Sequence, residues 1–320
     1  MDFKKLLTKQ AGIKWGIPLL VLIIVAILPL FVSSYYKTLI SFGLMYIILA
    51  VAWTMFSGTT GYISLASAAF YGLGIYTAAL YGEKMPFIFV ILIGAVVSFI
   101  VAFIIGAITL RLRGIFFSMF TFGLVLLIYQ VLIWYELSVQ SIRGYFVVVL
   151  SDNTIFYYLL GLFIITMAAS YLLKKSKYGL ALSSIGENEN AAEHIGVNVT
   201  MIKILIYSLS ATFMGAAGAI MATKLSYIDP NIAFDPMISF SPALMATFGG
   251  MGNIYGPVLG SVIFYFIQDR LQTGPLQNYY KLIFGAVLVA TIMYLPYGLM
   301  GLIQRLQKRI SGAKRASTSG

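Results

Sequence analysis

Residues Phe87–Leu110 read FIFVILIGAVVSFIVAFIIGAITL, twenty-four consecutive positions without a charged side chain. An α-helix needs about 20 mostly apolar residues to cross the hydrocarbon core of a bilayer, so this stretch can span a membrane alone. Arg111 and Arg113 end the run, and Gly114 separates it from the next apolar stretch. The stretch therefore predicts a transmembrane α-helix.

Apolar runs recur along the whole chain. Hydrophobic residues make up 60% of the sequence and charged residues 10%, whereas a soluble domain carries about 25% charged residues. Long runs favour helices over a β-barrel, whose strands alternate with a period of two. We expect a single all-α domain over residues 1–320, a polytopic transmembrane helical bundle of about eight to ten spans that includes broken or re-entrant helices. The other runs are Ile17–Val32, Thr38–Phe56, Tyr62–Tyr81, Ile115–Trp134, Thr154–Leu173, Met201–Thr223, Met237–Phe248, Ile254–Ile267 and Lys281–Ile303.

The formal net charge of +11 is compatible with nucleic-acid binding, but basic loops beside membrane spans explain it more simply. We therefore expect membrane lipids around the chain and no nucleic-acid partner. The sequence has no cysteine, which excludes disulfides and thiolate metal sites and leaves the redox compartment open. Aromatic and lysine residues follow the first apolar run where a signal peptide has small residues, so a cleaved signal peptide is not expected.

Lysine and arginine counts orient the chain, because cytoplasmic loops of membrane proteins carry an excess of both. If the N-terminus lies inside and each run crosses in turn, fifteen basic residues fall on the inner side and six on the outer side. Segments 1–16, 174–200 and 304–320 are therefore predicted to be cytoplasmic. The inner residues are Lys4, Lys5, Lys9, Lys14, Arg111, Arg113, Lys174, Lys175, Lys177, Lys203, Arg305, Lys308, Arg309, Lys314 and Arg315, and the outer ones are Lys37, Lys84, Arg143, Lys224, Arg270 and Lys281.

The segment Gly179–Thr200, GLALSSIGENENAAEHIGVNVT, is the polar interruption in this apolar chain. Glu187 and Glu189 open a run that favours a helix, because acidic residues suit the positive end of the helix dipole. His194 suits the negative end, and Gly196 suits the residue after the last turn. We expect one short surface helix outside the bilayer. Because His194 is the only histidine and fits a helix-end cation, neither a catalytic residue nor a metal site is expected.

Two glycine-rich breaks interrupt the apolar runs, Gly58–Leu65 (GTTGYISL) and Gly249–Gly260 (GGMGNIYGPVLG). Breaks near membrane depth are tolerated where the freed backbone groups face protein or a water-filled cavity. One interpretation is helix packing with an ordinary turn. The other is a pair of broken or re-entrant helices that line a substrate path. The second interpretation predicts path residues at Gly61, Ser64, Gly249, Gly250, Gly252 and Gly256.

The order of crossings suggests an internal repeat. The sets that begin at Ile17 and at Met201 each contain an outward crossing, an inward run, a glycine-rich break, an outward run and an inward span. Because the directions match, we expect a parallel repeat. Met237–Phe248 is too short to cross a bilayer alone, so full spanning and re-entry both stay open for residues 237–267.

Charge is missing from the middle of every predicted span. Proton- and ion-coupled transporters generally need charged groups, or carbonyl-lined ion sites, inside the membrane. We therefore expect the driving energy to come from an external motor subunit that docks on the polar segment. The chain also lacks the G-x-x-x-x-G-K-[ST] motif, so it is not expected to bind ATP by that route.

Short motifs spread over most of the chain carry a family resemblance. Glu187–Glu189, Ala191–Glu193 and Gly196–Val199 resemble the cytoplasmic coupling segment of the branched-chain amino acid ABC importer permeases. Gly61–Leu65 with Phe70–Gly74 looks like the first glycine-serine motif of that family. Its later motifs are similar to Arg111–Phe117 with Thr121, and to Gly249–Asn253 with Gly256–Gly260.

The chain departs from the family pattern at three places. Ala66 and Ser67 stand where the family usually has Gly and His, and Ser141–Gly144 stands in the region of a Thr-Gly-Gly-type element. These two departures leave the substrate open, since related permeases carry urea, other amino acids or other small polar molecules. Gly186 stands where an arginine commonly precedes the Glu-Asn-Glu triplet, which leaves docking in place with altered contacts.

The resemblance implies a permease domain that is not itself an enzyme. It would be a subunit of an ATP-driven ABC importer in a prokaryotic cytoplasmic (inner) membrane, moving branched-chain or similar small amino acids. Implied partners are ABC ATP-binding subunits, which would hold ATP and Mg, a second homologous permease and an extracytoplasmic solute-binding protein; no cofactor is expected in this chain. The alternatives are an ABC permease for urea or another small polar solute, and a stand-alone channel or secondary transporter for a neutral solute. The implied ATPase-coupling residues are Glu187, Asn188, Glu189, Ala191, Ala192, Glu193 and Gly196.

Overall fold

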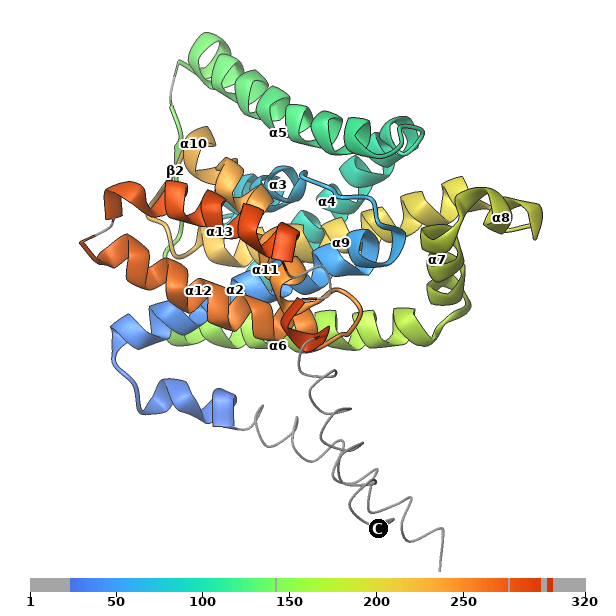
Figure 1. The fold of residues 1–320 in the computed structure, drawn as a ribbon. Coiled ribbons are helices and arrows are strands. Elements are labelled where there is room, and N and C mark those ends of the chain that lie inside the picture. Colours follow the sequence, from blue (N-terminus) through green and yellow to red (C-terminus); the bar gives the residue numbers. More distant parts are fainter. Residues whose placement is uncertain (1–23, 142, 276, 295–297, 302–320) are drawn as a thin grey trace, which may run out of the picture.

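The computed structural model describes residues 24–141, 143–275, 277–294 and 298–301 (Figure 1). The predicted cytoplasmic segments 1–16 and 304–320, with the basic residues they contain, lie outside the described residues. Part of the first predicted run, Ile17–Val32, also lies outside them.

Helices dominate the described chain, as the apolar runs predict. One small pairing joins two loops: β1 (Tyr145–Phe146) lies antiparallel to β2 (Tyr227–Ile228), with Tyr145 opposite Ile228. Short 3-10 helices occur at Leu28–Leu30 and Gln277–Tyr279, and π-helical turns at Thr54–Gly58 and Glu136–Gln140. The α-helices are α2 (Ser34–Trp53), α3 (Ser67–Tyr81), α4 (Phe87–Thr109), α5 (Ile115–Tyr135), α6 (Asp152–Lys175), α7 (Lys177–Glu187), α8 (Glu189–His194), α9 (Val199–Ala222), α10 (Pro230–Ala233), α11 (Pro236–Gly249), α12 (Gly256–Thr273) and α13 (Tyr280–Tyr294).

The lengths of the helices confirm the predicted helical membrane fold. Five segments of the described chain are long and apolar enough to cross a membrane: Ser34–Gly58, Phe87–Thr109, Ile115–Gln140, Asp152–Lys175 and Val199–Ala222. Helices α3 and α11 have only 15 and 14 residues. At 1.5 Å per residue each is shorter than the hydrocarbon core of about 30 Å. Each of these short helices adjoins one of the glycine-rich breaks.

Several helices begin or end at other residues than the predicted runs, and two of these differences have a clear physical cause. Helix α3 begins at Ser67 instead of Tyr62, because Gly61 adopts a φ of +75° and residues 61–66 form no helix. Helix α5 continues past Trp134, where the predicted apolar run ends, into the π-helical turn Glu136–Gln140. In that turn the buried Glu136 carboxylate accepts hydrogen bonds from the Tyr76 hydroxyl (2.7 Å) and the Gly144 N–H (3.0 Å). These donors allow the charged residue to enter the bundle and prolong the helix.

Helix α9 lies at the centre of the bundle and packs against α3 and α4. Its run of small residues, 215–219, is buried. A Cβ atom at Gly218 would collide with the Tyr71 carbonyl of α3, and one at Gly74 with the Gly215 carbonyl of α9. Close backbone approach of this kind gives membrane helices the van der Waals contact that holds them together. The small side chains of this run therefore allow α9 to lie close to α3 and α4.

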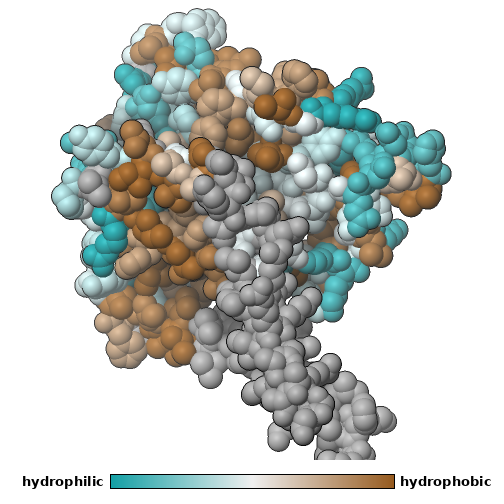
Figure 2. Space-filling view, viewed as in Figure 1, coloured by the Kyte–Doolittle hydropathy of each residue, from teal (hydrophilic) through white to brown (hydrophobic). Residues whose placement is uncertain are grey.

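The surface divides into polar ends and an apolar middle. Figure 2 shows hydrophobic residues over most of the visible face, with hydrophilic residues gathered toward its left and right edges. Helix α5 lies somewhat apart at the top of Figure 1, and its buried residues are confined to Phe117, Thr121 and Val125. Most of α5 is therefore available to lipid or to another subunit.

Candidate functional site

The polar interruption forms a pair of short helices at one end of the bundle, at the right in Figure 1. One helix was expected to begin at Glu187, and this prediction is wrong: Glu187 ends α7, and α8 begins at Glu189. Asn188 separates them because its backbone is extended (φ −159°, ψ 107°) and its side-chain oxygen accepts a hydrogen bond from the Ala191 N–H at 3.1 Å. Asn188 is thus the N-cap of α8.

Gly196 closes α8, as predicted. It adopts a φ of +86°; its N–H donates to the Glu193 carbonyl, and the Val197 N–H donates to the Ala192 carbonyl. This pair of bonds is the Schellman arrangement, which satisfies the last carbonyls of a helix. Beneath it, Ala192 is 1% exposed and packs with Ile185 of α7 and Val199 of α9. Among the predicted coupling residues, Glu187, Asn188, Ala191, Glu193 and Gly196 are exposed.

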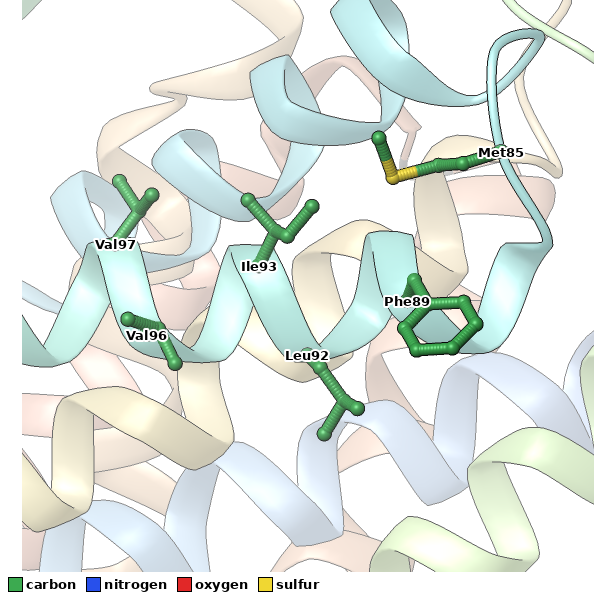
Figure 3. Close-up of a pocket in the computed structure, with 6 residues that line it drawn as sticks. All are labelled: Met85, Phe89, Leu92, Ile93, Val96 and Val97. Atoms are coloured by element: carbon green, nitrogen blue, oxygen red, sulfur yellow. The ribbon is translucent and has the colours of Figure 1, made fainter.

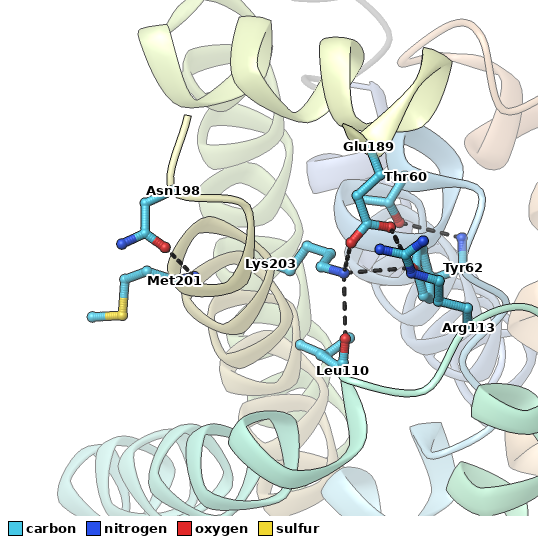
Figure 4. Close-up of polar contacts among 8 residues, drawn as sticks. All are labelled: Thr60, Tyr62, Leu110, Arg113, Glu189, Asn198, Met201 and Lys203. Atoms are coloured by element: carbon cyan, nitrogen blue, oxygen red, sulfur yellow. Dashed lines mark hydrogen bonds and ion pairs between the residues drawn. The ribbon is translucent and has the colours of Figure 1, made fainter. Parts of the chain in front are cut away.

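Glu189 faces inward and ties α8 to the bundle (Figure 4). Its carboxylate accepts hydrogen bonds from Lys203 Nζ and from the Tyr62 hydroxyl, both at 2.6 Å, and Arg113 Nε lies 4.0 Å away. Lys203 of α9 is 2% exposed and also donates to the Leu110 carbonyl at 3.3 Å. The cluster therefore joins α8, α9, the C-terminal end of α4 and the first glycine-rich break.

Electrostatics favours the ionised form of Glu189. Partial burial opposes ionisation, but the hydrogen bonds from Lys203 and Tyr62 and the charges of Lys203 and Arg113 outweigh it and hold the pKa of Glu189 below its usual value. In the sequence, Lys203 is recognisable only as one of the predicted inner-side charges. No spacing rule pairs residues 189 and 203, because a turn and a change of helix direction separate them.

The first break is packed, and its backbone groups are bonded within the chain. Ser64, a predicted path residue, is 3% exposed, and its carbonyl accepts a hydrogen bond from Trp53 Nε1 at 2.7 Å. The Ile63 carbonyl accepts one from the Ser118 hydroxyl, and the Leu65 N–H donates to Thr121 Oγ1. The backbone groups freed by this break are therefore bonded to protein groups, which is one of the two ways in which a membrane protein tolerates a broken helix. Gly61, by contrast, is exposed and has open space around it.

The second break combines close packing with an exposed loop. Gly249 and Gly256 are buried, and a Cβ on Gly249 would collide with the Gly256 carbonyl where α11 meets α12. Gly250 is also buried and adopts a φ of +104°. Gly252 is exposed, and its carbonyl accepts a hydrogen bond from Lys174 Nζ at 3.0 Å. Lys174, at the end of α6, thus fixes the loop near the start of α7.

The structure brings both breaks and the polar helices to the same end of the bundle. The Cβ position of Gly58, in the first break, lies 3.3 Å from Met251 Cβ in the second. Gly186 of α7 lies so close to Thr59 that a Cβ would collide with the Thr59 carbonyl. This contact gives a physical reason for Gly186, since the side chain of an arginine there would push α7 away from the first break.

A family comparison agrees with this arrangement. Residues 35–292 match the family described as the permease component of a branched-chain amino acid transport system. The chain belongs to this family. The permease is 26% identical to the high-affinity branched-chain amino acid transport system permease protein LivM of Salmonella typhimurium, over 94% of this chain and 78% of that protein. It is 31% identical to the ribose import permease protein RbsC of Escherichia coli over 39% of this chain and 40% of that protein. No solved structure matches it.

Family membership makes this permease a transport component of the membrane and not an enzyme. The five long apolar segments make it a multi-pass membrane protein. Relatives that carry different names, LivM and RbsC, leave the transported solute open at these identities.

One pocket of the permease, about 340 Å³ in volume, lies along α4 and contains apolar side chains only (Figure 3). It is lined by Met85, Phe89, Leu92, Ile93, Val96 and Val97. Without a hydrogen-bonding side chain the pocket cannot orient a polar solute, since such sites place a few polar groups among apolar ones. It suits a lipid chain or an apolar side chain better than a transported solute.

Proposed function

We propose that this permease is a subunit of an ATP-driven ABC importer that moves branched-chain or similar small amino acids across the cytoplasmic membrane of a prokaryote. It works with ATP-binding subunits that hold ATP and Mg, a second homologous permease and an extracytoplasmic solute-binding protein. Both termini and residues 174–200 lie in the cytoplasm in this scheme, where the ATP-binding subunits have access to α7 and α8.

The anchoring of α8 carries the proposal. Ala191 and Glu193 are exposed on α8 and are available to a partner subunit. On the inward side, Glu189 is bonded to Lys203 of α9 and to Tyr62 of the first break. Since α9 packs against α3 and α4, a displacement of α8 is transmitted to the centre of the bundle. A motor subunit docked on α8 can therefore move the membrane spans through this contact.

The substrate path is proposed at the meeting point of the two breaks. Gly61 and Gly252 are exposed there, whereas Ser64, Gly249, Gly250 and Gly256 are buried and pack the surrounding helices. In this proposal the exposed glycines border the path, and the buried residues hold the helices that move when α8 moves. The path thus opens at the end of the bundle that receives the force.

An α8 variant tests the coupling in the assembled transporter, co-expressed with the products of neighbouring reading frames. Ala191→Arg adds a bulky charge to the exposed face of α8 and should weaken co-purification of the ATP-binding subunit about tenfold or more, a loss of about 1.4 kcal/mol. It should also abolish ATP-driven leucine uptake in proteoliposomes while the thermal unfolding midpoint stays unchanged. Glu83→Arg, at an exposed residue between α3 and α4, is the control. Unimpaired coupling in the Ala191→Arg transporter would contradict the proposal.

Two results would change the proposed function. Leucine uptake by the purified permease alone, without ATP or an ATP-binding subunit, would favour a stand-alone channel or secondary transporter. The similarity to the ribose import permease RbsC makes ribose the second solute to assay. ATP-driven uptake of ribose but not leucine would keep the ABC mechanism and change the substrate class.

A further inference from the structure

A second pocket, of about 270 Å³, lies between α2 and α12 and has no role in the site described above. Thr38 and Tyr46 of α2 line it together with Gln268, Asp269 and Gln272 of α12. It lies toward the end of the bundle opposite α7 and α8, because α2 starts there and reaches the first break only at its C-terminal end. Its volume is near the lower limit of about 300 Å³ for small-molecule sites.

One acceptor in this pocket is buried without a partner. Gln268 is 5% exposed, and its side-chain carbonyl oxygen makes no hydrogen bond with any residue that the structure describes. Nearly all buried polar atoms in native proteins have a partner in protein or water, and exceptions call for an explanation. A side-chain carbonyl can only accept, so the missing partner is a hydrogen-bond donor.

The neighbouring Asp269 carboxylate also needs a hydrogen-bond donor as its partner. Asp269 is half-buried and forms no ion pair with those cations whose side chains the structure describes. Arg270, the next residue, lies over the Phe266 ring instead, 5.2 Å from its centroid. A carboxyl group and an unpartnered carbonyl on adjacent residues together suit a ligand that carries several N–H donors.

The rest of the lining fits the other parts of a small amino acid. The Gln272 amide and the Thr38 hydroxyl can donate to a carboxylate. Leu39 and Phe42 add apolar surface for an aliphatic side chain. The pocket therefore contains complementary groups for the ammonium, the carboxylate and the apolar portion of one ligand, which the apolar pocket on α4 lacks.

We propose that the pocket between α2 and α12 is a binding site for a small aliphatic α-amino acid, with Asp269 and the Gln268 carbonyl receiving its ammonium group. The proposal rests on the proposed function and deepens it, because it gives the transported solute a first contact at the end of the permease remote from the ATP-binding subunits.

The absence of cysteine from the sequence permits a direct test, since a single introduced thiol reports on the pocket alone. In the assembled transporter in vesicles, a Tyr35→Cys variant, at a residue that lines the pocket without an assigned contact to the ligand, is treated with a water-soluble methanethiosulfonate. Leucine should slow labelling in a saturable way, reaching about tenfold at ten times its dissociation constant. The leucine analogue 4-methylpentanoate, which lacks the ammonium, should not slow it. Glu83→Cys, at an exposed residue outside the pocket lining, is the matched control, and Tyr265→Cys provides a second reporter if the first variant does not assemble.

The role of the carboxylate is tested by adding Asp269→Asn to the Tyr35→Cys variant, which should abolish protection by leucine. Equal protection by leucine and 4-methylpentanoate, protection by ribose alone, or no protection in either reporter would each overturn the site. ATP-driven leucine uptake by the unmodified transporter is measured in the same vesicles. Failure of that uptake counts against the proposed function, whereas normal uptake without protection counts against this pocket only.

Discussion

The ammonium of Lys203 lies 2.6 Å from the carboxylate of Glu189, and this contact joins the central helix α9 to the exposed helix α8. The lysine is 2% exposed and the glutamate side chain 19% exposed. The pair is therefore buried on one side and open on the other. It holds α8 in register with the first glycine-rich break through Tyr62, which donates to the same carboxylate.

Removing only one member of this pair should destabilise the permease more than removing both. Glu189→Gln leaves the Lys203 charge buried and uncompensated. Breaking a buried ion pair in this way typically lowers the free energy of unfolding by about 3–5 kcal/mol, and we expect no more than that here. Glu189→Gln combined with Lys203→Met removes both charges and should recover part of that loss. Unfolding in detergent, analysed as a double-mutant cycle, measures the coupling. Strictly additive effects would show that the contact contributes nothing.

The same pair predicts a dependence of stability on pH. Because the pKa of Glu189 is held below its usual value of 4.5, the folded state binds this proton less readily than the unfolded state. The contribution of Glu189 is therefore complete above pH 4.5 and disappears as the pH falls through the lowered pKa. The difference in unfolding midpoint between the unmodified permease and Glu189→Gln should be constant near pH 7 and shrink below pH 4.5. A difference that grows on acidification would contradict this assignment.

Gly186→Ala should impair coupling, because its Cβ would collide with the Thr59 carbonyl and separate α7 from the first break. Overpacking of this kind costs about 1–3 kcal/mol. Reduced thermal stability and a lower ATPase activity in the assembled transporter are expected. Gly161→Ala, in α6, is the control, since open space surrounds that position. Equal thermal stability and equal ATPase activity of the two variants would show that the contact between α7 and the first break is not needed for coupling.

Substitution should distinguish those glycines of the second break that pack helices from those that border the substrate path. Gly249→Ala places a Cβ against the Gly256 carbonyl and should destabilise the fold by about 1–3 kcal/mol. Gly252→Ala meets open space and should leave stability unchanged. Thermal unfolding and leucine uptake are measured for both. Loss of uptake in the stable Gly252→Ala variant would support its place on the path, and normal uptake would remove it.

The hydrogen bond from Trp53 to the first break should contribute measurably to stability. Trp53→Phe keeps an aromatic ring but leaves the Ser64 carbonyl without its donor, which lies 2.7 Å away. An unpaired buried polar group costs about 1–3 kcal/mol. The unfolding midpoint should fall, whereas Trp134→Phe, at an exposed position of α5, should change little. An equal effect of the two substitutions would show that the bond is dispensable.

Much of the architecture follows from the sequence alone. The stretch from Phe87 to Leu110 becomes α4 almost residue for residue, because an uninterrupted apolar run of that length satisfies its backbone only as a helix in lipid. Gly196 closes α8 because glycine tolerates the positive φ that the closing turn requires. Local rules also placed a glycine-rich break before α3 and another between α11 and α12, although Gly256–Gly260 of the second predicted break belong to α12.

The tertiary structure decided how these pieces meet. The pairing of Glu189 with Lys203, the contact of Gly186 with Thr59 and the meeting of the two breaks at Gly58 and Met251 all join residues from different helices. Each depends on how the helices cross, and hydropathy records only how far a helix runs and which residues are apolar. The sequence alone therefore determined a multi-span helical permease, while packing decided which polar groups are bonded inside the chain and which remain free for a partner or a solute.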